Sequence, residues 1–233
     1  MKRVAIVQSN YIPWKGYFDL VRHCDEFILY DDVQYTRRDW RNRNRIKTPT
    51  GPQWLTIPVE VSGKYHQRIR DTRICDPDWG RKHWTTLCHN YAKAPFFGHY
   101  RDFFEPLYLG TRETFLSEVN RTFIAAIAPL VGAHTRLRWS SDYPLAEGRS
   151  ARLVQLCVAC EATLYLSGPA AKGYLDETLF TEAGIRVEWM DYSEYPEYPQ
   201  LFGPFRHDVS ILDLLFNTGP DAVRYMKPSW PHE

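Results

Sequence analysis

The sequence lacks any long apolar run. Its 233 residues open with Met1 to Arg3, followed by only four apolar residues, Val4 to Val7. A membrane helix needs roughly 20 apolar residues, and the apolar segment of a secretory signal is also longer than this run. We therefore expect no membrane span, no secretory signal and a cytoplasmic location.

The chain also lacks an excess of charge of either sign, because its formal net charge is only +1. Nucleic-acid-binding domains are usually strongly basic, so we expect no nucleic-acid partner. Apolar residues make up 44% of the sequence, which predicts a folded chain rather than a disordered one. The length suits one domain, which we place at residues 1–233.

Cysteine is sparse and irregularly spaced. The five cysteines are odd in number and scattered, which predicts reduced thiols rather than a disulfide framework. Cys157 and Cys160 have the spacing of half a zinc site, but no second Cys/His pair lies near them in the sequence. We therefore expect buried structural cysteines and no bound metal.

Three familiar catalytic or nucleotide-binding signatures are absent as well. The sequence contains no Walker phosphate loop, no paired-glycine dinucleotide fingerprint and no serine nucleophile elbow. Any site must therefore use other residues, which the predicted fold brings together.

What the sequence does contain is a repeated alternation of short apolar strands and helices. A strand at 4–7, a helix at 16–24 and a strand at 27–30 form a βαβ pattern, which implies parallel strands. The other predicted elements are strands at 54–61, 69–74, 135–139, 163–166 and 185–190 and helices at 78–91, 99–109, 112–131, 148–160 and 209–217. We predict an α/β fold, with a mostly parallel sheet of Rossmann-like layout and a helical layer inserted at about 78–131.

In such sheets, ligands bind at the carboxyl ends of the strands. The first predicted strand ends in the loop 8–16, which is rich in donors and aromatic rings and leads into a helix N-terminus that suits phosphate. We predict that Gln8, Tyr11 and Trp14 bind a ligand there, together with Tyr17 of the helix. The alternative is a packed structural loop with Trp14 in the core.

The second strand ends at the segment 31–35, where further polar residues gather. In an extended segment alternate residues share a face, so Asp32 and Gln34 point the same way. Asp32 is a candidate base for an attacking amine or hydroxyl, and Gln34 and Tyr35 are candidate binding residues. Binding of a sugar hydroxyl and pairing with downstream arginines are the other interpretations of Asp32.

A basic stretch follows at residues 36–47. Arg43, Arg45 and Lys47 alternate with Asn44 and an isoleucine, so an extended backbone places the cations on one face. The planar guanidinium group is suited to phosphate. We predict a clamp for a diphosphate or carboxylate that includes Asn44, while a plain charged loop and a short RNA contact are the alternatives.

The predicted helix at 78–91 carries a stripe of Trp79, His83, Leu87 and Tyr91 at a spacing of four, which places them along one face. An imidazole titrates near pH 7, so His83 is a candidate general base, and Tyr91 is a candidate binding residue. A histidine on an aromatic stripe is also commonly a hydrogen-bonded core residue, and this alternative stays open.

One further polar pair follows a predicted strand. Ser167 and Gly168 come directly after the strand at 163–166. Backbone N–H groups at such a turn are able to hold a developing oxyanion, so Ser167 is a candidate catalytic residue and Gly168 a candidate binding residue.

Six segments resemble the signature motifs of the WbqC-like family, in order and over nearly the whole chain. They are Gln8-x-x-Tyr11-x-Pro13-Trp14-x-Gly16-Tyr17-Phe18, Asp31 to Tyr35, Trp40 to Lys47, Tyr91-x-Lys93-Ala94-Pro95-Phe96-Phe97, Tyr165 to Gly168 and Ser210 to Asn217. The resemblance implies a role in making or decorating a nucleotide-linked amino sugar for a bacterial surface polysaccharide such as the O-antigen.

The residues and the resemblance together favour an enzyme that transfers an acyl or aminoacyl group to the amine of a nucleotide-linked sugar. The expected donor is an acyl-carrier or coenzyme A thioester, which makes an acyl carrier protein an expected partner, and no bound cofactor is expected. His83 or Asp32 would remove the proton of the amine. Two alternatives remain: an adenylating enzyme similar to nucleotidylyltransferases, whose paired histidines are absent here, and a non-catalytic ligand-binding protein of a polysaccharide pathway.

Overall fold

The computed structural model describes residues 1–144 and 147–228. Its centre is a five-stranded parallel sheet of order β5-β2-β1-β6-β7. The strands are β1 (Arg3–Val7), β2 (Glu26–Leu29), β5 (Arg136–Trp139), β6 (Leu164–Ser167) and β7 (Arg186–Trp189). The predicted α/β class with a mostly parallel sheet is confirmed.

The chain reverses its direction across the sheet beside β1. It moves from β1 to β2 and then to β5, and afterwards returns to β6 and β7 on the other side of β1. Val4 of β1 is accordingly paired with Glu26 of β2 on one side and with Tyr165 of β6 on the other. The carboxyl ends of β1 and β6 therefore flank a topological switch point, where sheets of this kind bind ligands.

Alternation along the central strands builds a core on each face of the sheet. Ala5 and Phe27 belong to one apolar cluster, whereas Val4, Ile6 and Ile28 belong to the other. Successive strand residues point to opposite faces, so a strand buried on both faces reads as a continuous apolar run. This explains the uninterrupted apolar sequence of β1.

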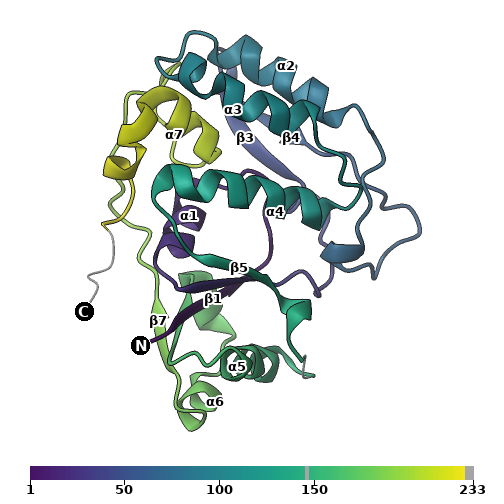
Figure 1. The fold of residues 1–233 in the computed structure, drawn as a ribbon, viewed down its shortest axis with the longest axis vertical. Coiled ribbons are helices and arrows are strands. Elements are labelled where there is room, and N and C mark those ends of the chain that lie inside the picture. The colour runs from purple at the N-terminus through teal and green to yellow at the C-terminus, as the bar shows by residue number, and fades with distance from the viewer. Residues whose placement is uncertain (145–146, 229–233) are drawn as a thin grey trace.

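Four helices cover the two faces of the sheet (Figure 1). Helices α1 (Lys15–Arg22) and α4 (Leu116–Ile127) pack on one face, and α5 (Arg149–Ala159) and α6 (Glu177–Glu182) on the other. The sequence pattern gives no sign of α6, because six residues are fewer than two turns and too few to show a helical period.

The second tier lies above the sheet in Figure 1. It consists of the hairpin of β3 (Arg43–Thr48) and β4 (Gly51–Thr56), helices α2 (Trp79–Tyr91) and α3 (Phe97–Leu109), and α7 (Ile211–Thr218). Helices α2 to α4 fall within the layer predicted at 78–131, but α4 packs on the sheet. The strand expected at 69–74 is instead a 3₁₀ turn at Ile69–Asp71, followed by isolated β-bridges at Arg73 and Ile74.

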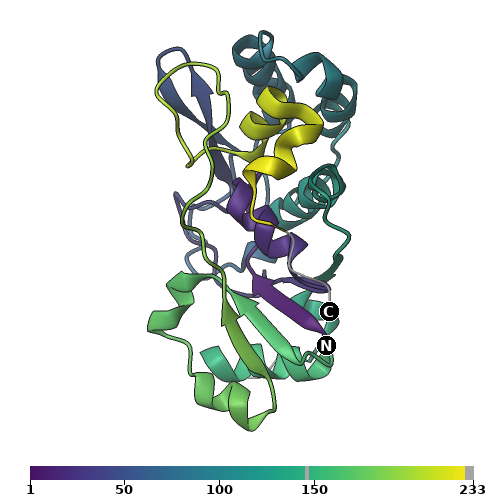
Figure 2. The same ribbon diagram turned by 90° about the vertical axis from the view of Figure 1, so that its left-hand side faces the viewer.

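Residues 190–210, which we call the strap, contain no helix or strand and run from the sheet edge to the β3–β4 hairpin (Figure 2). Two buried lysines hold this segment. The Lys47 amine donates to Gln200 Oε1 at 2.8 Å, and the Lys15 amine donates to the Pro196 carbonyl at 3.1 Å. The strap thereby connects the second tier to the edge of the sheet.

Candidate functional site

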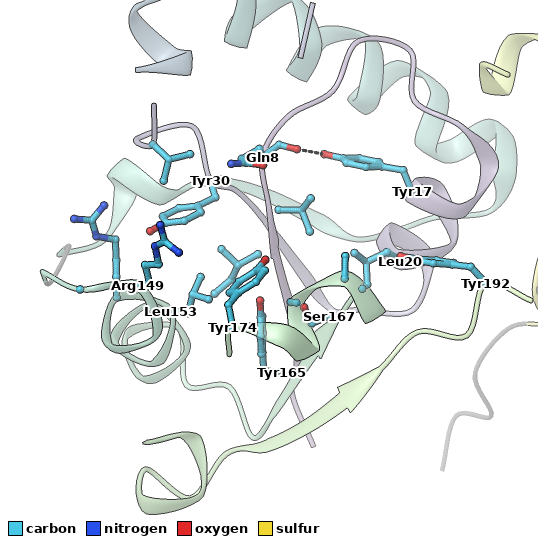
Figure 3. Close-up of a pocket in the computed structure, with 18 of the residues that line it drawn as sticks. Gln8, Tyr17, Leu20, Tyr30, Arg149, Leu153, Tyr165, Ser167, Tyr174 and Tyr192 are labelled. Atoms are coloured by element: carbon cyan, nitrogen blue, oxygen red, sulfur yellow. Dashed lines mark hydrogen bonds between the residues drawn. The ribbon is translucent and has the colours of Figure 1, made fainter. Parts of the chain in front are cut away.

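A pocket of about 600 Å³ lies at the switch point of the sheet, and we call it the switch-point pocket (Figure 3). Its volume is in the usual range for small-molecule sites. The ends of β1, β2 and β6, helix α1, the first turn of α5 and the strap all contribute to its wall. The residues that line it include Gln8, Trp14, Tyr17, Tyr30, Arg149, Arg152, Tyr165, Ser167, Gly168, Tyr174 and Tyr192.

Three residues predicted from the first loop line this pocket: Gln8, Trp14 and Tyr17. The Tyr17 phenol donates a hydrogen bond to the Gln8 carbonyl at 3.2 Å, as Figure 3 shows, which ties α1 to the end of β1. The Trp14 indole makes edge contacts with Tyr192 and Tyr195 of the strap, at ring-centroid distances of 5.3 and 5.7 Å. The loop and the strap therefore form one wall of the pocket.

Gly16 allows the Trp14 indole to lie against the start of α1. A Cβ atom at residue 16 would lie 2.3 Å from Trp14 Cζ2, which is far inside van der Waals contact. Only glycine leaves room for the ring at this place. The Trp14-x-Gly16 pattern is therefore a packing requirement of the pocket wall.

The end of β6 supplies the two residues predicted for oxyanion binding. Ser167 is buried and Gly168 half-buried, and both line the pocket. Burial raises the pKa of the Tyr165 phenol, and a hydrogen bond with Ser167 opposes that shift. A Cβ atom at residue 168 would lie 3.6 Å from the Tyr192 ring, so Gly168 faces the strap at ordinary contact distance.

Two arginines outside the predicted set also line the pocket. Arg149 and Arg152 lie in the first turn of α5, which begins after Gly148 with a φ of 88°. Burial raises the pKa of Tyr30, and the hydrogen-bonded Arg152 guanidinium opposes this shift. The signal available in the sequence was a pair of arginines three residues apart at the start of a predicted helix, a spacing that places both on one face.

The charge of the pocket is positive in the part of the chain that the structure describes. Its lining there includes Arg149 and Arg152 but no aspartate, glutamate or histidine. Tyrosines at positions 30, 165, 174 and 192 add flat rings with polar ends. Anions are favoured by the guanidinium groups and by the helix N-terminus beside them.

Tyr11 and His83 lie elsewhere, in the core of the second tier. The buried Tyr11 phenol contacts His83 Nδ1 at 2.8 Å, and His83 Nε2 lies 3.1 Å from the Thr56 carbonyl. A carbonyl only accepts, so Nε2 carries the proton and Nδ1 accepts from Tyr11. Burial lowers the pKa of His83 to about 4. This arrangement matches the core-histidine alternative, while the catalytic role of His83 stays a prediction.

Asp32 lines a different cavity, at the end of β2 and β5. Its carboxylate accepts hydrogen bonds from Arg70 at 2.9 Å and from the Ser140 hydroxyl at 2.6 Å. Pairing with a downstream arginine, one of the interpretations left open above, is thus what Asp32 does here. The neighbouring Asp31 is buried and accepts from the Ser9 amide at 2.8 Å, which anchors the first loop.

The cations of the basic stretch lie on the hairpin. The guanidinium carbons of Arg43 and Arg45 lie 4.1 and 4.6 Å from the centre of the Trp54 ring, and Arg45 also pairs with Asp208. The two arginines therefore share one face of β3. The buried Lys47 amine is instead engaged with the strap.

Tyr91 and Asn44 serve the interior of the second tier. The Tyr91 phenol donates to Asp213 Oδ2 at 2.7 Å and accepts from the Lys47 amide at 3.0 Å. The Asn44 amide donates to the Tyr11 and Ile12 carbonyls at 3.1 and 2.9 Å. These contacts hold the first loop against the hairpin.

The last two predicted residues lie apart from the pocket. The exposed Gln34 side chain donates to the Tyr65 carbonyl at 2.7 Å, and Tyr35 is buried. Of the predicted site residues, the switch-point pocket thus brings together Gln8, Trp14, Tyr17, Ser167 and Gly168. The predicted residues of the second strand end, Asp32, Gln34 and Tyr35, do not line this pocket, and neither do the arginines of the hairpin.

Two further features concern residues 1–144 and 147–228 alone. In this part of the chain no three side chains of histidine, cysteine, aspartate or glutamate gather where they could hold a metal ion. The helices described there are all too short or too polar to cross a membrane.

The fold and the pocket define an α/β protein with a Rossmann-like sheet and an anion-favouring cavity at its switch point. Residues 8–225 match the model of the WbqC-like protein family, and the chain belongs to this family. It is 54% identical over 227 residues to "Uncharacterized protein Rv1507c" of Mycobacterium tuberculosis (strain ATCC 25618 / H37Rv), an alignment that covers 97% of this chain and 98% of that protein. No solved structure matches the chain at a significant level.

Proposed function

We propose that the switch-point pocket binds a nucleotide-linked amino sugar, and that the protein transfers an acyl or aminoacyl group from a thioester to the amine of that sugar in the cytoplasm. The observation that carries the proposal is that Arg149 and Arg152 line the same cavity as the Ser167-Gly168 strand end, at the switch point. This position and this charge suit a ligand that contains phosphate.

The binding step follows from the chemistry of the lining. A diphosphate takes charge-assisted hydrogen bonds from Arg149 and Arg152 and lies near the N-terminus of α5. The base and the sugar present flat faces to tyrosines such as Tyr30 and Tyr174. A volume of about 600 Å³ holds a ligand of this size.

The transfer step forms a C–N bond and breaks a C–S bond. The amine attacks the thioester carbonyl, the leaving thiolate takes up a proton, and the amine loses one. Ser167 and Gly168 at the end of β6 are proposed to face the developing oxyanion. Coenzyme A or an acyl carrier protein is the proposed thioester carrier.

The proton acceptor has to come from beside the pocket, because the described lining includes no carboxylate and no histidine. Asp32 is our proposed acceptor. It follows Tyr30 by two residues. Burial raises the pKa of the Tyr30 phenol, Arg152 opposes this shift, and the negative charge of Asp32 adds to it, which places Asp32 close to this pocket residue. His83 is less suited, since it lies buried in the core of the second tier and does not line the pocket.

Binding is tested by titration calorimetry with uridine, thymidine and guanosine diphosphates. We expect at least one of them to bind, and Arg152→Gln and Arg149→Gln to weaken that binding roughly tenfold or more, as expected for the loss of a charged hydrogen bond. Arg224→Gln, which changes an exposed arginine on the far C-terminal segment, is the control. A loss in Arg43→Gln with none in the two α5 variants would move the site to the hairpin.

Turnover is tested by release of free thiol from acetyl coenzyme A in the presence of an amino-sugar nucleotide. We expect thiol release to require the amine and to stop when the amine is already acetylated. Release of pyrophosphate from ATP without any thioester requirement would support the adenylating alternative and reject acyl transfer.

A further inference from the structure

A second cavity of about 260 Å³ also has Trp14 in its lining. Pro13, Trp14 and Trp40 form its walls, and Asn10, His207 and Asp208 lie at its polar edge. We call it the Trp14–Trp40 cavity. Because Trp14 also lines the switch-point pocket, the two cavities share one wall.

The polar groups of this cavity are mostly engaged with other parts of the protein. Asp208 accepts hydrogen bonds from Arg206 at 2.8 Å and pairs with Arg45. Asn44, which also lines the cavity, donates to two backbone carbonyls of the first loop. The cavity is therefore an apolar slot whose charges are already paired, and it has little to offer a charged ligand.

Burial and the nearby Lys15 charge lower the pKa of His207. The ring is therefore mainly neutral near pH 7 and offers one donor or one acceptor rather than a charge. The cavity combines two tryptophan walls with few neutral polar groups, among them this imidazole and the Asn10 side chain. A compact apolar group with at most one polar end suits this lining.

We propose that the Trp14–Trp40 cavity holds the side chain of the transferred acyl group and selects a compact apolar ring or branched chain. This inference rests on the proposed function, in which donor and acceptor must meet. Two cavities that share Trp14 in their walls bring an acyl group and a sugar amine near each other. An apolar cavity of roughly 150 Å³ already binds benzene, so this larger one takes a benzyl-sized group.

The surface beside the cavity suits the carrier of such a group. Trp40 is 38% exposed and packs on Trp54 with ring centroids 5.2 Å apart. Arg43 and Arg45 lie over the same Trp54 ring. Thioester carriers reach their acyl group through a phosphate-bearing arm, and guanidinium groups are suited to such a phosphate.

The experiment is an NMR titration of the full chain with benzyl alcohol, which follows the tryptophan indole N–H signals. We expect saturable shifts of the Trp14 and Trp40 signals, and an affinity at least tenfold lower in Trp40→Ala and several-fold lower in His207→Ala. Tyr65→Ala is the matched control, because Tyr65 is an exposed aromatic residue away from this cavity, and it should bind the probe like the wild type.

The result that overturns the inference is a lack of saturable shifts at Trp14 and Trp40, or an equal affinity in Trp40→Ala. A parallel titration with uridine diphosphate separates the two proposals. If the nucleotide binds and benzyl alcohol does not, the inference fails and the proposed function stands. If benzyl alcohol binds as expected and no nucleotide does, the cavity is a ligand site and the proposed function fails.

Discussion

The second tier and the switch-point pocket use their polar residues in opposite ways. In the second tier the partners are internal: Tyr11 is bonded to His83, and Asp213 accepts from Tyr91 and Tyr198. In the pocket, arginines of α5 and the end of β6 surround an open cavity. The comparison teaches that the polar residues of this sequence satisfy one another in the first region and line a cavity in the second.

The largest expected effect is a loss of stability when the buried Asp213 carboxylate of the second tier is removed. Asp213→Ala leaves the Tyr91, Tyr198 and Gln200 donors without their acceptor, which should lower the free energy of unfolding by about 3 kcal/mol or more. Urea unfolding measures this loss. Asp221→Ala, at an exposed ion pair, is the control. An equally small loss of stability in both variants would contradict the stabilising role of the polar residues in the second tier.

The next effect is a pH dependence at His83. Its pKa in the folded protein, about 4, lies below the ordinary 6.5, so as the pH falls the unfolded chain takes up the proton first. The neutral His83 ring therefore makes its full contribution to the free energy of unfolding above about pH 6.5, and this contribution is lost as the pH falls toward 4. Between pH 7 and pH 5 the loss is about 2 kcal/mol.

His83→Gln should remove this loss of stability between pH 7 and pH 5. Urea unfolding curves of the wild type and of the variant at the two pH values measure it. Other titrating groups cancel in the comparison, because both proteins contain them. A variant of unchanged stability and pH dependence, but with strongly reduced turnover, would restore His83 to the reaction and contradict its structural role.

A smaller effect concerns the wall that the pocket shares with the second cavity. Gly16→Ala forces the Trp14 ring away from α1, and such overpacking should cost about 1–2 kcal/mol of stability and weaken nucleotide binding. Gly98→Ala is the matched control, because Gly98 is likewise the second residue of its helix and its Cβ would meet open space. Unfolding and calorimetry together test both consequences.

The smallest expected effect on stability is at the end of β6. A Cβ at residue 168 has room beside Tyr192, so Gly168→Ala should change stability by less than about 0.5 kcal/mol. The added methyl group narrows the pocket, and we expect a several-fold weaker nucleotide affinity. Gly173→Ala, where the Cβ would meet open space, should leave both unchanged. Equal nucleotide affinities in the two variants would show that Gly168 is not part of the binding site.

The sheet was predictable because its strands are short apolar runs that alternate with amphipathic helices. The parallel pairing of β1 and β2 followed from the βαβ pattern, and the general rule for parallel sheets pointed to the end of β1, where the structure has a cavity. The rule was applied to the ends of the first two strands, whereas the cavity also takes in the end of β6. The hairpin was harder to predict, because β3 reads as a run of charge, and its pairing with β4 depends on a two-residue connection at Pro49-Thr50.

The site was only partly predictable, because burial is not visible in a residue's type. Tyr11, Asn44 and Tyr91 look like ligand-binding residues, yet their partners are backbone or side-chain groups of the fold. Arg149 and Arg152 look like ordinary charges of a helix surface. Only the crossing of the chain from β5 to β6 brings that helix to the switch point.

The most direct test of the central claim is a crystal structure of the protein soaked or grown with the nucleotide diphosphate that binds best. The account predicts density for the diphosphate at Arg149 and Arg152, beside Ser167 and Gly168. Density for the diphosphate at Arg43 and Arg45 of the hairpin, with the switch-point pocket empty, would contradict it.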